Sequence, residues 1–344
     1  MKRNPFYDNT RTLLIFLVVF GHVIQPLIQV SAGVHTLYMW MYTFHMPAFI
    51  LLAGFFAKGY ETKGYLLNLA KKLLLPYLIF QLLYMLFYYW TGDEAWYNPL
   101  WEPYWSLWFL ISLFCWHLLL IWYKKRSPVF GITLAFAIGL AIGYIDVIGH
   151  TLSVSRTFFF FPFFLIGYWL SNEQVMRLKS NAVKVASVAI MLSVAVILHV
   201  APDFDVFWLL GSKSYSELGM GTFGIFARLL VYIGGAVMTV CVLSWVPTKQ
   251  NALTYIGSRT LYVYLLHGFF VQFFRIKDVF SVGPLLDTGW FAGLSIVLLA
   301  ILSALLVLVL SSKWMMGLWQ PILEGKTTIL RNEVKEWRTR TDQS

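Results

Sequence analysis

Charged residues are scarce in this sequence. Only 12% of its 344 residues are Asp, Glu, Lys or Arg, whereas a soluble globular domain carries roughly 25%. The length would allow about two ordinary domains, but no stretch is polar enough to form the surface of one. The scarcity of charge therefore excludes a soluble fold for most of the chain.

Several chemistries also lack their usual motifs. The sequence has no glycine-rich phosphate loop, no His-Glu-x-x-His and no cysteine cluster, so ATP hydrolysis and metal catalysis have no sequence support and we predict no metal site. Its two cysteines, Cys115 and Cys241, fall inside apolar runs, which argues against a disulfide framework. No carboxylate lies deep in an apolar run, which weighs against a proton pump built on acidic relays.

Apolar residues, by contrast, make up 59% of the chain. They are grouped in about ten runs, most of them near the roughly 20 residues that a helix needs to cross ~30 Å of hydrocarbon. The pattern predicts an all-α, polytopic integral membrane protein embedded in the lipid bilayer. The predicted spans are 11–30, 36–57, 73–90, 104–123, 128–145, 157–170, 182–200, 226–246, 260–274 and 290–310.

The positions of lysine and arginine predict the orientation of these spans. If the N-terminus is cytoplasmic, the segments on the cytoplasmic side hold 21 of the 26 lysines and arginines. Because these residues accumulate on the cytoplasmic side of membrane proteins, we predict that both termini lie inside the cell. The net charge of +10 is then a topology signal, and we expect no nucleic-acid partner. The cations assigned to the outer side are Arg156, Lys213, Arg228, Arg275 and Lys277.

The predicted organisation has three parts. Residues 1–10 form a cytoplasmic N-terminal segment, residues 11–312 a transmembrane domain, and residues 313–344 a basic cytoplasmic tail. The end of the tail, from Lys326 to Ser344, is mildly amphipathic. It suits both a helix on the anionic inner leaflet and a solvated end.

The first span contains the most informative pair of polar residues. Arg11 lies at its cytoplasmic mouth, and His22 follows eleven residues later, about 16 Å deeper along a helix. Eleven steps of 100° end about 20° past three full turns, so both side chains share one face. A titratable group at this depth is costly and therefore a candidate for function. The alternative is that Arg11 snorkels to the headgroups while His22 bonds a neighbouring helix.

Other polar groups lie within or at the ends of spans. His45 lies near the middle of the second span, and His267 lies in the ninth, three residues after Tyr264 on the same face. Each histidine alone is more often a satisfied core residue than a catalyst. Arg156 stands at the outer entry of the sixth span, where it could anchor the interface or hold an anionic or hydroxyl-rich substrate.

The chain resembles the bacterial membrane acyltransferase-3 family, whose opening helix carries Arg-x10-His. The stretch Tyr7-Asp8-x-x-Arg11, with ten further residues before His22, is similar to that hallmark. In the second helix, Phe44-His45-Met46-Pro47 is similar to the signature of one branch of the family, described as fucose 4-O-acetylase-like. Fragments similar to the second, third, fourth, sixth and ninth helices follow in order: Phe44-His45-Met46-Pro47 with Ala53-Gly54-Phe55-Phe56, Lys71-Lys72-Leu73-Leu74-Leu75-Pro76-Tyr77, Leu107-Trp108-Phe109-Leu110, Arg156 with Phe161-Pro162-Phe163-Phe164-Leu165-Ile166-Gly167-Tyr168, and Ser258-Arg259-Thr260-Leu261-Tyr262 through His267-Gly268.

The resemblance implies an O-acyltransferase in the bacterial cytoplasmic membrane. It would move an acyl group, usually acetyl, from acyl-CoA to a hydroxyl of a cell-surface or exported glycan. Acetyl-CoA would be a co-substrate, and no permanently bound cofactor is expected. One departure concerns the acceptor: other branches carry a Glu soon after a Trp-Ser-Leu in the fourth span, and here Trp108-Phe109-Leu110 follows Trp105-Ser106-Leu107.

Residue roles follow from this chemistry as expectations. His22 would act as general base on the acceptor hydroxyl, or would carry the acyl group covalently. Arg11 would position the donor or stabilise developing negative charge. The donor phosphates would meet the basic inner face. The remaining substrate-binding candidates are Lys71 and Lys72 for the donor, His45, Tyr264 and His267 in the polar lining, and Arg156 for the sugar.

Two other functions fit part of the pattern. A transporter or flippase for glycans or lipid-linked sugars would explain about ten helices and the outward arginines, but it gives the Arg11–His22 face no clear task. A non-catalytic membrane scaffold is disfavoured by the histidines at membrane depth.

Overall fold

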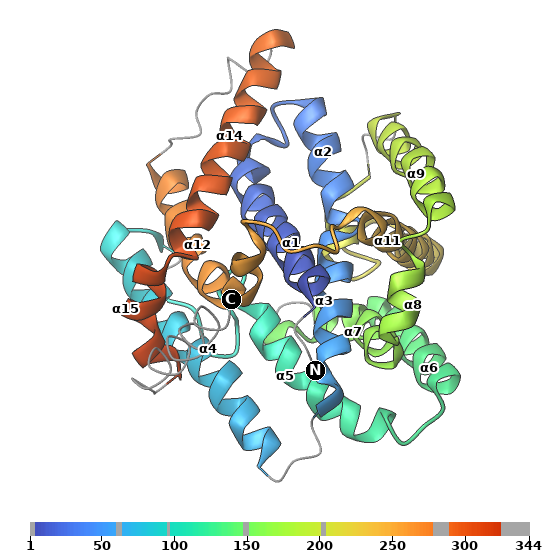
Figure 1. Ribbon diagram of the computed structural model, residues 1–344. Coiled ribbons are helices and arrows are strands. Elements are labelled where there is room, and N and C mark those ends of the chain that lie inside the picture. The colour runs from blue at the N-terminus through green and yellow to red at the C-terminus, as the bar shows by residue number, and fades with distance from the viewer. Residues whose placement is uncertain are drawn as a thin grey trace, which may run out of the picture.

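The computed structural model describes residues 4–59, 64–94, 97–146, 151–200, 204–277 and 289–324. Within these ranges every regular element is a helix, which confirms the all-α prediction (Figure 1). The α-helices are α1 (Pro5–Ile24), α2 (Ala32–Tyr42), α3 (His45–Phe55), α4 (Tyr65–Thr91), α5 (Trp108–Tyr123), α6 (Pro128–Ala141), α7 (Val154–Trp169), α8 (Asn172–Arg177), α9 (Asn181–Val200), α10 (Phe207–Leu210), α11 (Gly224–Trp245), α12 (Thr260–Ile276), α14 (Gly289–Leu310) and α15 (Lys313–Glu324). Short 3-10 turns are η1 (Gln25–Leu27), η2 (Phe56–Gly59), η4 (Ile142–Tyr144), η6 (Thr151–Ser153), η7 (Gly221–Phe223) and η8 (Thr254–Ser258).

Each of the ten predicted spans contains a helix. In the described part of the chain, six helical segments are long and apolar enough to cross a membrane: Pro5–Leu27, Ala32–Lys58, Tyr65–Thr91, Asn181–Val200, Gly221–Trp245 and Gly293–Leu310. Shorter apolar helices occupy Trp108–Tyr123, Pro128–Tyr144 and Thr260–Ile276, and α7 covers the sixth predicted span. The structure therefore supports a membrane protein with six candidate spans, while the number ten stays a prediction.

Helix α1 lies at the centre of the bundle, with α12 and α14 on one side and α2 and α3 on the other (Figure 1). It begins cleanly because the Asn4 side chain accepts a hydrogen bond from the backbone N–H of Phe6 at 3.0 Å, and Pro5 needs no N–H partner at the first position. Most of its residues are buried. The central position gives α1 contact with α3 and α12, two of the helices that build the site.

The second predicted span is broken in its middle. Helix α2 ends at Tyr42 and α3 begins at His45. Pro47 accounts for the break, because it has no N–H to donate to the carbonyl of Thr43 and its ring would collide with that carbonyl in a continuous helix. The Thr43 hydroxyl instead donates to the carbonyl of Trp40 at 2.7 Å. The break places His45 at the first position of a new helix.

Two glycines bring α3 and α7 into backbone contact. A Cβ added at Gly54 would lie 1.9 Å from the carbonyl oxygen of Phe164, and one added at Gly167 would lie 1.8 Å from that of Leu51. Such close approach through small residues is a common way for membrane helices to pack, since lipid supplies no hydrophobic drive between them. This contact fixes α7 against the helix that follows His45.

Contacts between distant segments gather at two opposite ends of the bundle. We call the end that is rich in lysine and arginine the basic end. There the Asn9 amide donates to the carbonyls of Pro247 and Lys249. Arg259 donates to the carbonyl of Ser311 at the same end. At the opposite end, Arg275 donates to the carbonyl of His22. These are the groups that the charge pattern assigned to the inner and outer sides, respectively. Which end faces the cytoplasm stays a prediction.

The first twelve residues of the predicted tail, Lys313–Glu324, are helical. They form α15, in which Leu323 is buried and Trp319 packs on Phe80 of α4 with ring centroids 5.4 Å apart. The amphipathic segment from Lys326 to Ser344 lies outside the described residues.

Candidate functional site

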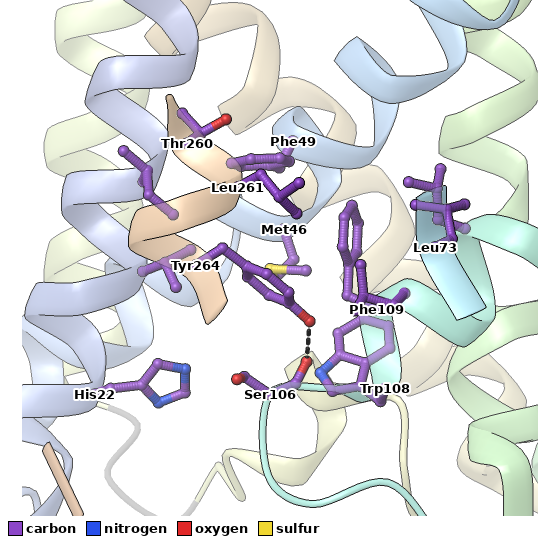
Figure 2. A pocket seen from close by; sticks show the side chains of 14 residues that line it. His22, Met46, Phe49, Leu73, Ser106, Trp108, Phe109, Thr260, Leu261 and Tyr264 are labelled. Carbon is purple, nitrogen blue, oxygen red and sulfur yellow. Dashed lines mark hydrogen bonds between the residues drawn. The ribbon is translucent and has the colours of Figure 1, made fainter. Parts of the chain in front are cut away.

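A cavity of about 140 Å³ runs beside α1 (Figure 2). Ile15, Val18 and His22 line it, and their spacing of three and four residues places them on one face of the helix. Arg11, four residues before Ile15, continues the same stripe toward the basic end. The shared face predicted from the sequence is thus the face that borders the cavity, with His22 at its deepest lining position on α1.

The rest of the wall is mostly apolar. A dry apolar cavity of about 150 Å³ holds a molecule the size of benzene, so this one has room for a small group. The polar groups that interrupt the wall are His22, Ser106, Thr260 and Tyr264. The other lining residues are Met46 and Phe49 of α3, Leu73 of α4, Trp108, Phe109, Leu110 and Leu113 of α5, and Leu261 of α12.

Basic side chains stand at the end of the cavity that is lined by Leu73 and Thr260. Arg11 keeps 29% of its side chain exposed, lies 3.6 Å from the Asp8 carboxylate, and has its guanidinium carbon 4.3 Å from the centre of the Phe56 ring. Lys71 and Lys72 are exposed and directly precede Leu73 on α4. None of these three cations lines the cavity itself; they form a water-accessible basic mouth next to its lining residues Ile15 and Leu73, and His22 lies deeper in the bundle.

Trp105 covers His22 on the side away from Arg11. The centroid of the His22 ring lies 4.2 Å from that of Trp105 and 5.6 Å from that of His267, and Trp105 lies 5.3 Å from His267. Trp105 has φ of +42°, a left-handed conformation that is costly for a bulky residue and persists only where the surroundings impose it. A Cβ added at Gly268 would lie 2.6 Å from the Trp105 ring, so the indole is pressed flat on the α12 backbone.

The His267 imidazole has a fixed tautomer. Its Nδ1 faces the carbonyls of Val263 at 3.0 Å and Tyr264 at 2.7 Å, so Nδ1 carries the proton that it donates. Nε2 is then the basic nitrogen, and it is buried with no hydrogen-bond partner among the described residues. The same holds for Nδ1 of His22, which has no partner in the described part of the chain. Two imidazoles with free nitrogens at membrane depth can accept or relay a proton.

Trp105 is delivered by a segment that enters the bundle before α5. Near the middle of α4, the Gln81 side chain accepts a hydrogen bond from the N–H of Tyr104 at 3.0 Å and donates to the carbonyl of Glu102 at 2.8 Å. The Tyr77 hydroxyl donates to the carbonyl of Leu100 at 2.6 Å. Irregular backbone is tolerated at membrane depth only where protein satisfies its polar groups, and these two side chains do so. We call residues 97–107 the inserted segment.

A family model described as an acyltransferase domain, that of the acyltransferase-3 family, matches residues 4–312. The chain belongs to this family. The match covers nearly all of the described structure, including the cavity, its basic mouth and the inserted segment. No curated protein and no solved structure matches the chain.

The other predicted site residues of this acyltransferase lie at differing distances from the cavity. Tyr264 lines it and donates its hydroxyl to the carbonyl of Ser106, which ties α12 to the inserted segment (Figure 2). His45 lies outside the lining: its Nδ1 faces the carbonyl of Met41 at 3.0 Å and its ring packs edge-on against Tyr42. Arg156 lies behind the cavity wall, over the ring of Trp108.

Three residues around the candidate site were not among those predicted from the sequence. In the sequence, Trp105 is distinguished only by the absence of the glutamate that other branches carry soon after the Trp-Ser-Leu motif. Gln81 is the one amide in the apolar run 73–90, and an isolated amide at that depth is a signal for a buried polar contact. Arg275 had been counted only as an outer cation, yet it donates to the His22 carbonyl at 2.7 Å and to the Gln25 side-chain oxygen at 2.9 Å, which fixes the end of α1.

Proposed function

We propose that the chain transfers an acyl group, typically acetyl, from acyl-CoA to a hydroxyl of a cell-surface or exported glycan, with His22 as general base and Arg11 as the donor-positioning residue. The observation that carries the proposal is the cavity that follows the Arg11–His22 stripe. In it, the donor phosphates meet Arg11, Lys71 and Lys72 at the basic mouth. The slender pantetheine arm lies along the apolar wall toward His22, about 16 Å deeper.

The chemistry then needs one proton acceptor and one leaving group. The acceptor hydroxyl oxygen attacks the thioester carbonyl carbon while a nitrogen of His22 takes the hydroxyl proton. The carbon–sulfur bond breaks, and the CoA thiolate takes the proton back from the imidazolium. Trp105 and His267 are positioning residues that hold the His22 ring. This route is balanced without a metal, oxidant or permanently bound cofactor.

A covalent route uses the same geometry. His22 would attack the thioester, form an acetyl-imidazole and release CoA, and the sugar hydroxyl would then take the acetyl group. Rapid quenching of the enzyme with acetyl-CoA in the absence of acceptor distinguishes the routes. In that experiment, a His22 peptide heavier by one acetyl group supports the covalent route. An unmodified His22 peptide supports direct transfer.

The proposal includes a multi-pass location in the bacterial cytoplasmic membrane with both termini inside. The likeness to the fucose 4-O-acetylase-like branch supports a sugar hydroxyl as acceptor. Reporter fusions after Tyr97 and Ser180 test the topology, since Tyr97 is expected outside and Ser180 inside. A cytoplasmic signal after Tyr97 would overturn it.

The decisive experiment follows radiolabelled acetyl from acetyl-CoA into glycan with protein purified into nanodiscs. Wild type is expected to yield an O-acetyl ester, and His22→Asn is expected to lose at least about 100-fold in rate. The matched control is His117→Gln, a buried α5 histidine that stacks near Tyr65 and does not line the cavity; its rate should stay near wild type.

The transporter alternative predicts a different result. If purified protein with acetyl-CoA yields no acetylated glycan, while glycan export in cells depends on the chain and on His22, then the enzyme proposal fails. Family membership favours the acyltransferase.

A further inference from the structure

Arg156 has unused hydrogen-bonding capacity. A guanidinium offers five N–H donors, but in the described structure this group forms no hydrogen bond, and its carbon lies 5.2 Å from the centre of the Trp108 ring. Burial strongly desolvates its charge, yet its side chain keeps some accessible surface. Unsatisfied donors at membrane depth are costly, which indicates that a partner outside the described residues takes them.

Arg275 is a second cation in this region. Two of its hydrogen bonds hold the end of α1, and its guanidinium carbon lies 5.5 Å from the centre of the Trp105 ring. Its Nε is buried without a partner. Among the residues that the structure describes, neither Arg275 nor Arg156 has a carboxylate within ion-pair distance. Within the described residues, these two partly buried cations therefore have no counter-ion.

Both arginines converge on one pair of tyrosines. The rings of Tyr38 and Tyr42 stack with centroids 3.9 Å apart, and each guanidinium interacts electrostatically with both phenols. Tyr42 also packs on Gly21, directly before His22, since a Cβ there would lie 2.9 Å from its ring. Arg275 and Tyr42 therefore reach the end of α1 beside His22, and the stack of Tyr42 on Tyr38 extends the cluster from there.

We propose that Arg156 and Arg275, with the hydroxyls of Tyr38 and Tyr42, form a binding site for an anionic group of the acceptor. The group is a carboxylate or phosphate, both of which guanidinium binds with paired hydrogen bonds. Two chemical sources supply it: the carboxylate of an acidic sugar, or the phosphate of a lipid that carries the glycan. Bound here, the anion places neighbouring sugar hydroxyls next to His22. The inference rests on the proposed function, because it names the class of acceptor.

The position of the site favours the acceptor over the donor. The phosphates of CoA are assigned to the mouth at Arg11, separated from His22 by about 16 Å of helix. The Arg156–Arg275 pair lies beyond His22, with Trp105 and Trp108 under the two guanidinium groups. An anion held there and a donor held at the mouth approach His22 from opposite ends.

The test measures binding of defined anions to the full-length protein in zwitterionic nanodiscs. The probes are methyl β-glucuronoside, its neutral partner methyl β-glucoside, undecaprenyl phosphate and neutral undecaprenol, each titrated while Tm is followed. We expect one anionic probe to raise Tm in a saturable way and its neutral partner to have no effect. A response to the glucuronoside identifies a sugar carboxylate, and a response to the lipid phosphate identifies the carrier.

Variants then locate the binding. Arg156→Gln should weaken anion binding at least about tenfold, and Arg156→Lys should keep part of it. Because Arg156 forms no hydrogen bond within the described part of the chain, its loss should leave the fold intact. Lys277→Gln is the matched control: it removes an exposed cation two residues after Arg275 and should not change binding.

Three results would overturn the proposal: equal stabilisation by charged and neutral probes, unchanged anion affinity in Arg156→Gln, or competition between CoA and the anion. CoA binding and acetyl transfer are measured on the same samples. Normal transfer without anion binding rejects this inference alone. Anion binding at Arg156 without any CoA binding or transfer rejects the proposed function instead.

Discussion

The imidazole of His22 and the indole of Trp105 lie with ring centroids 4.2 Å apart. Trp105 has φ of +42°, a strained backbone conformation that keeps its ring against His22. Strain of this kind tends to gather at functional sites. The contact therefore supplies the most direct test of how His22 is held.

Removing the Trp105 ring should lower kcat while leaving the KM for acetyl-CoA nearly unchanged, because Trp105 supports His22 but does not line the donor cavity. Misplacement of a reacting group by about 1 Å can cost 100-fold, so Trp105→Ala should lose about 10- to 100-fold in kcat. Trp105→Phe should recover part of the loss. Steady-state kinetics measure the split.

The control for Trp105 is Trp101→Ala, on the same inserted segment but 55% exposed. Its kcat should stay near that of wild type. A rise in KM for acetyl-CoA with unchanged kcat in Trp105→Ala would show that the ring contacts the donor instead of positioning His22.

Replacing Gln81 by Leu should loosen the inserted segment. The change leaves the N–H of Tyr104 and the carbonyl of Glu102 buried without their partner, at a cost of roughly 1–3 kcal/mol each. We expect a lower Tm in detergent and reduced transfer. Leu82→Ala, at a neighbouring position that is 56% exposed, should change Tm little. Equal effects of the two substitutions would mean that the segment is held by other contacts.

Adding one methyl group at Gly54 or Gly167 should disrupt the α3–α7 contact. The added carbon would overlap a backbone carbonyl of the facing helix, and a carbonyl cannot move aside as a flexible side chain can. Gly54→Ala and Gly167→Ala should each fold poorly. Gly234→Ala is the control, since nothing lies within 4 Å of the added carbon, and it should gain up to about 1 kcal/mol in helix propensity.

Replacing Arg11 by Gln should raise the KM for acetyl-CoA more than it lowers kcat. A charge-assisted contact to a phosphate contributes roughly 1.5–3 kcal/mol, which corresponds to about 10- to 100-fold. The effect should shrink at high salt, because the mouth is open to water. Arg126→Gln, which removes another exposed cation beyond α5, should leave KM unchanged. A pure loss of kcat in Arg11→Gln would place Arg11 in the reacting centre.

The sequence predicts which side chains share a face of one helix, because the helix turns by the same angle at every residue. A step of 100° per residue is enough to predict that Arg11 and His22 share a face, and the cavity borders that face. The all-helical fold followed from the apolar runs. Charge placement predicts which connecting segments share a side of the membrane, because that rule acts on each segment separately, and this topology stays a prediction.

What the sequence could not predict depends on contacts between helices. Nothing in the spacing of His267 indicates that its ring lies 5.6 Å from that of His22. The inserted segment is polar enough to be an ordinary connection, and only its bonds to Gln81 and Tyr77 show that it enters the bundle. The break before His45 was readable in principle from Pro47, but a proline also fits inside a membrane helix.

The inserted segment has a consequence for the cell that houses the protein. A catalyst that meets one substrate from each face of a membrane risks becoming a conduit for ions between them. Trp105 lies between His22 and the backbone at Gly268, and in the proposed reaction its ring would close the bundle to ions where the two substrates meet. We expect proton leakage through liposomes that contain wild type to match that of empty vesicles, so that acylation proceeds without draining the electrochemical gradient across the bilayer.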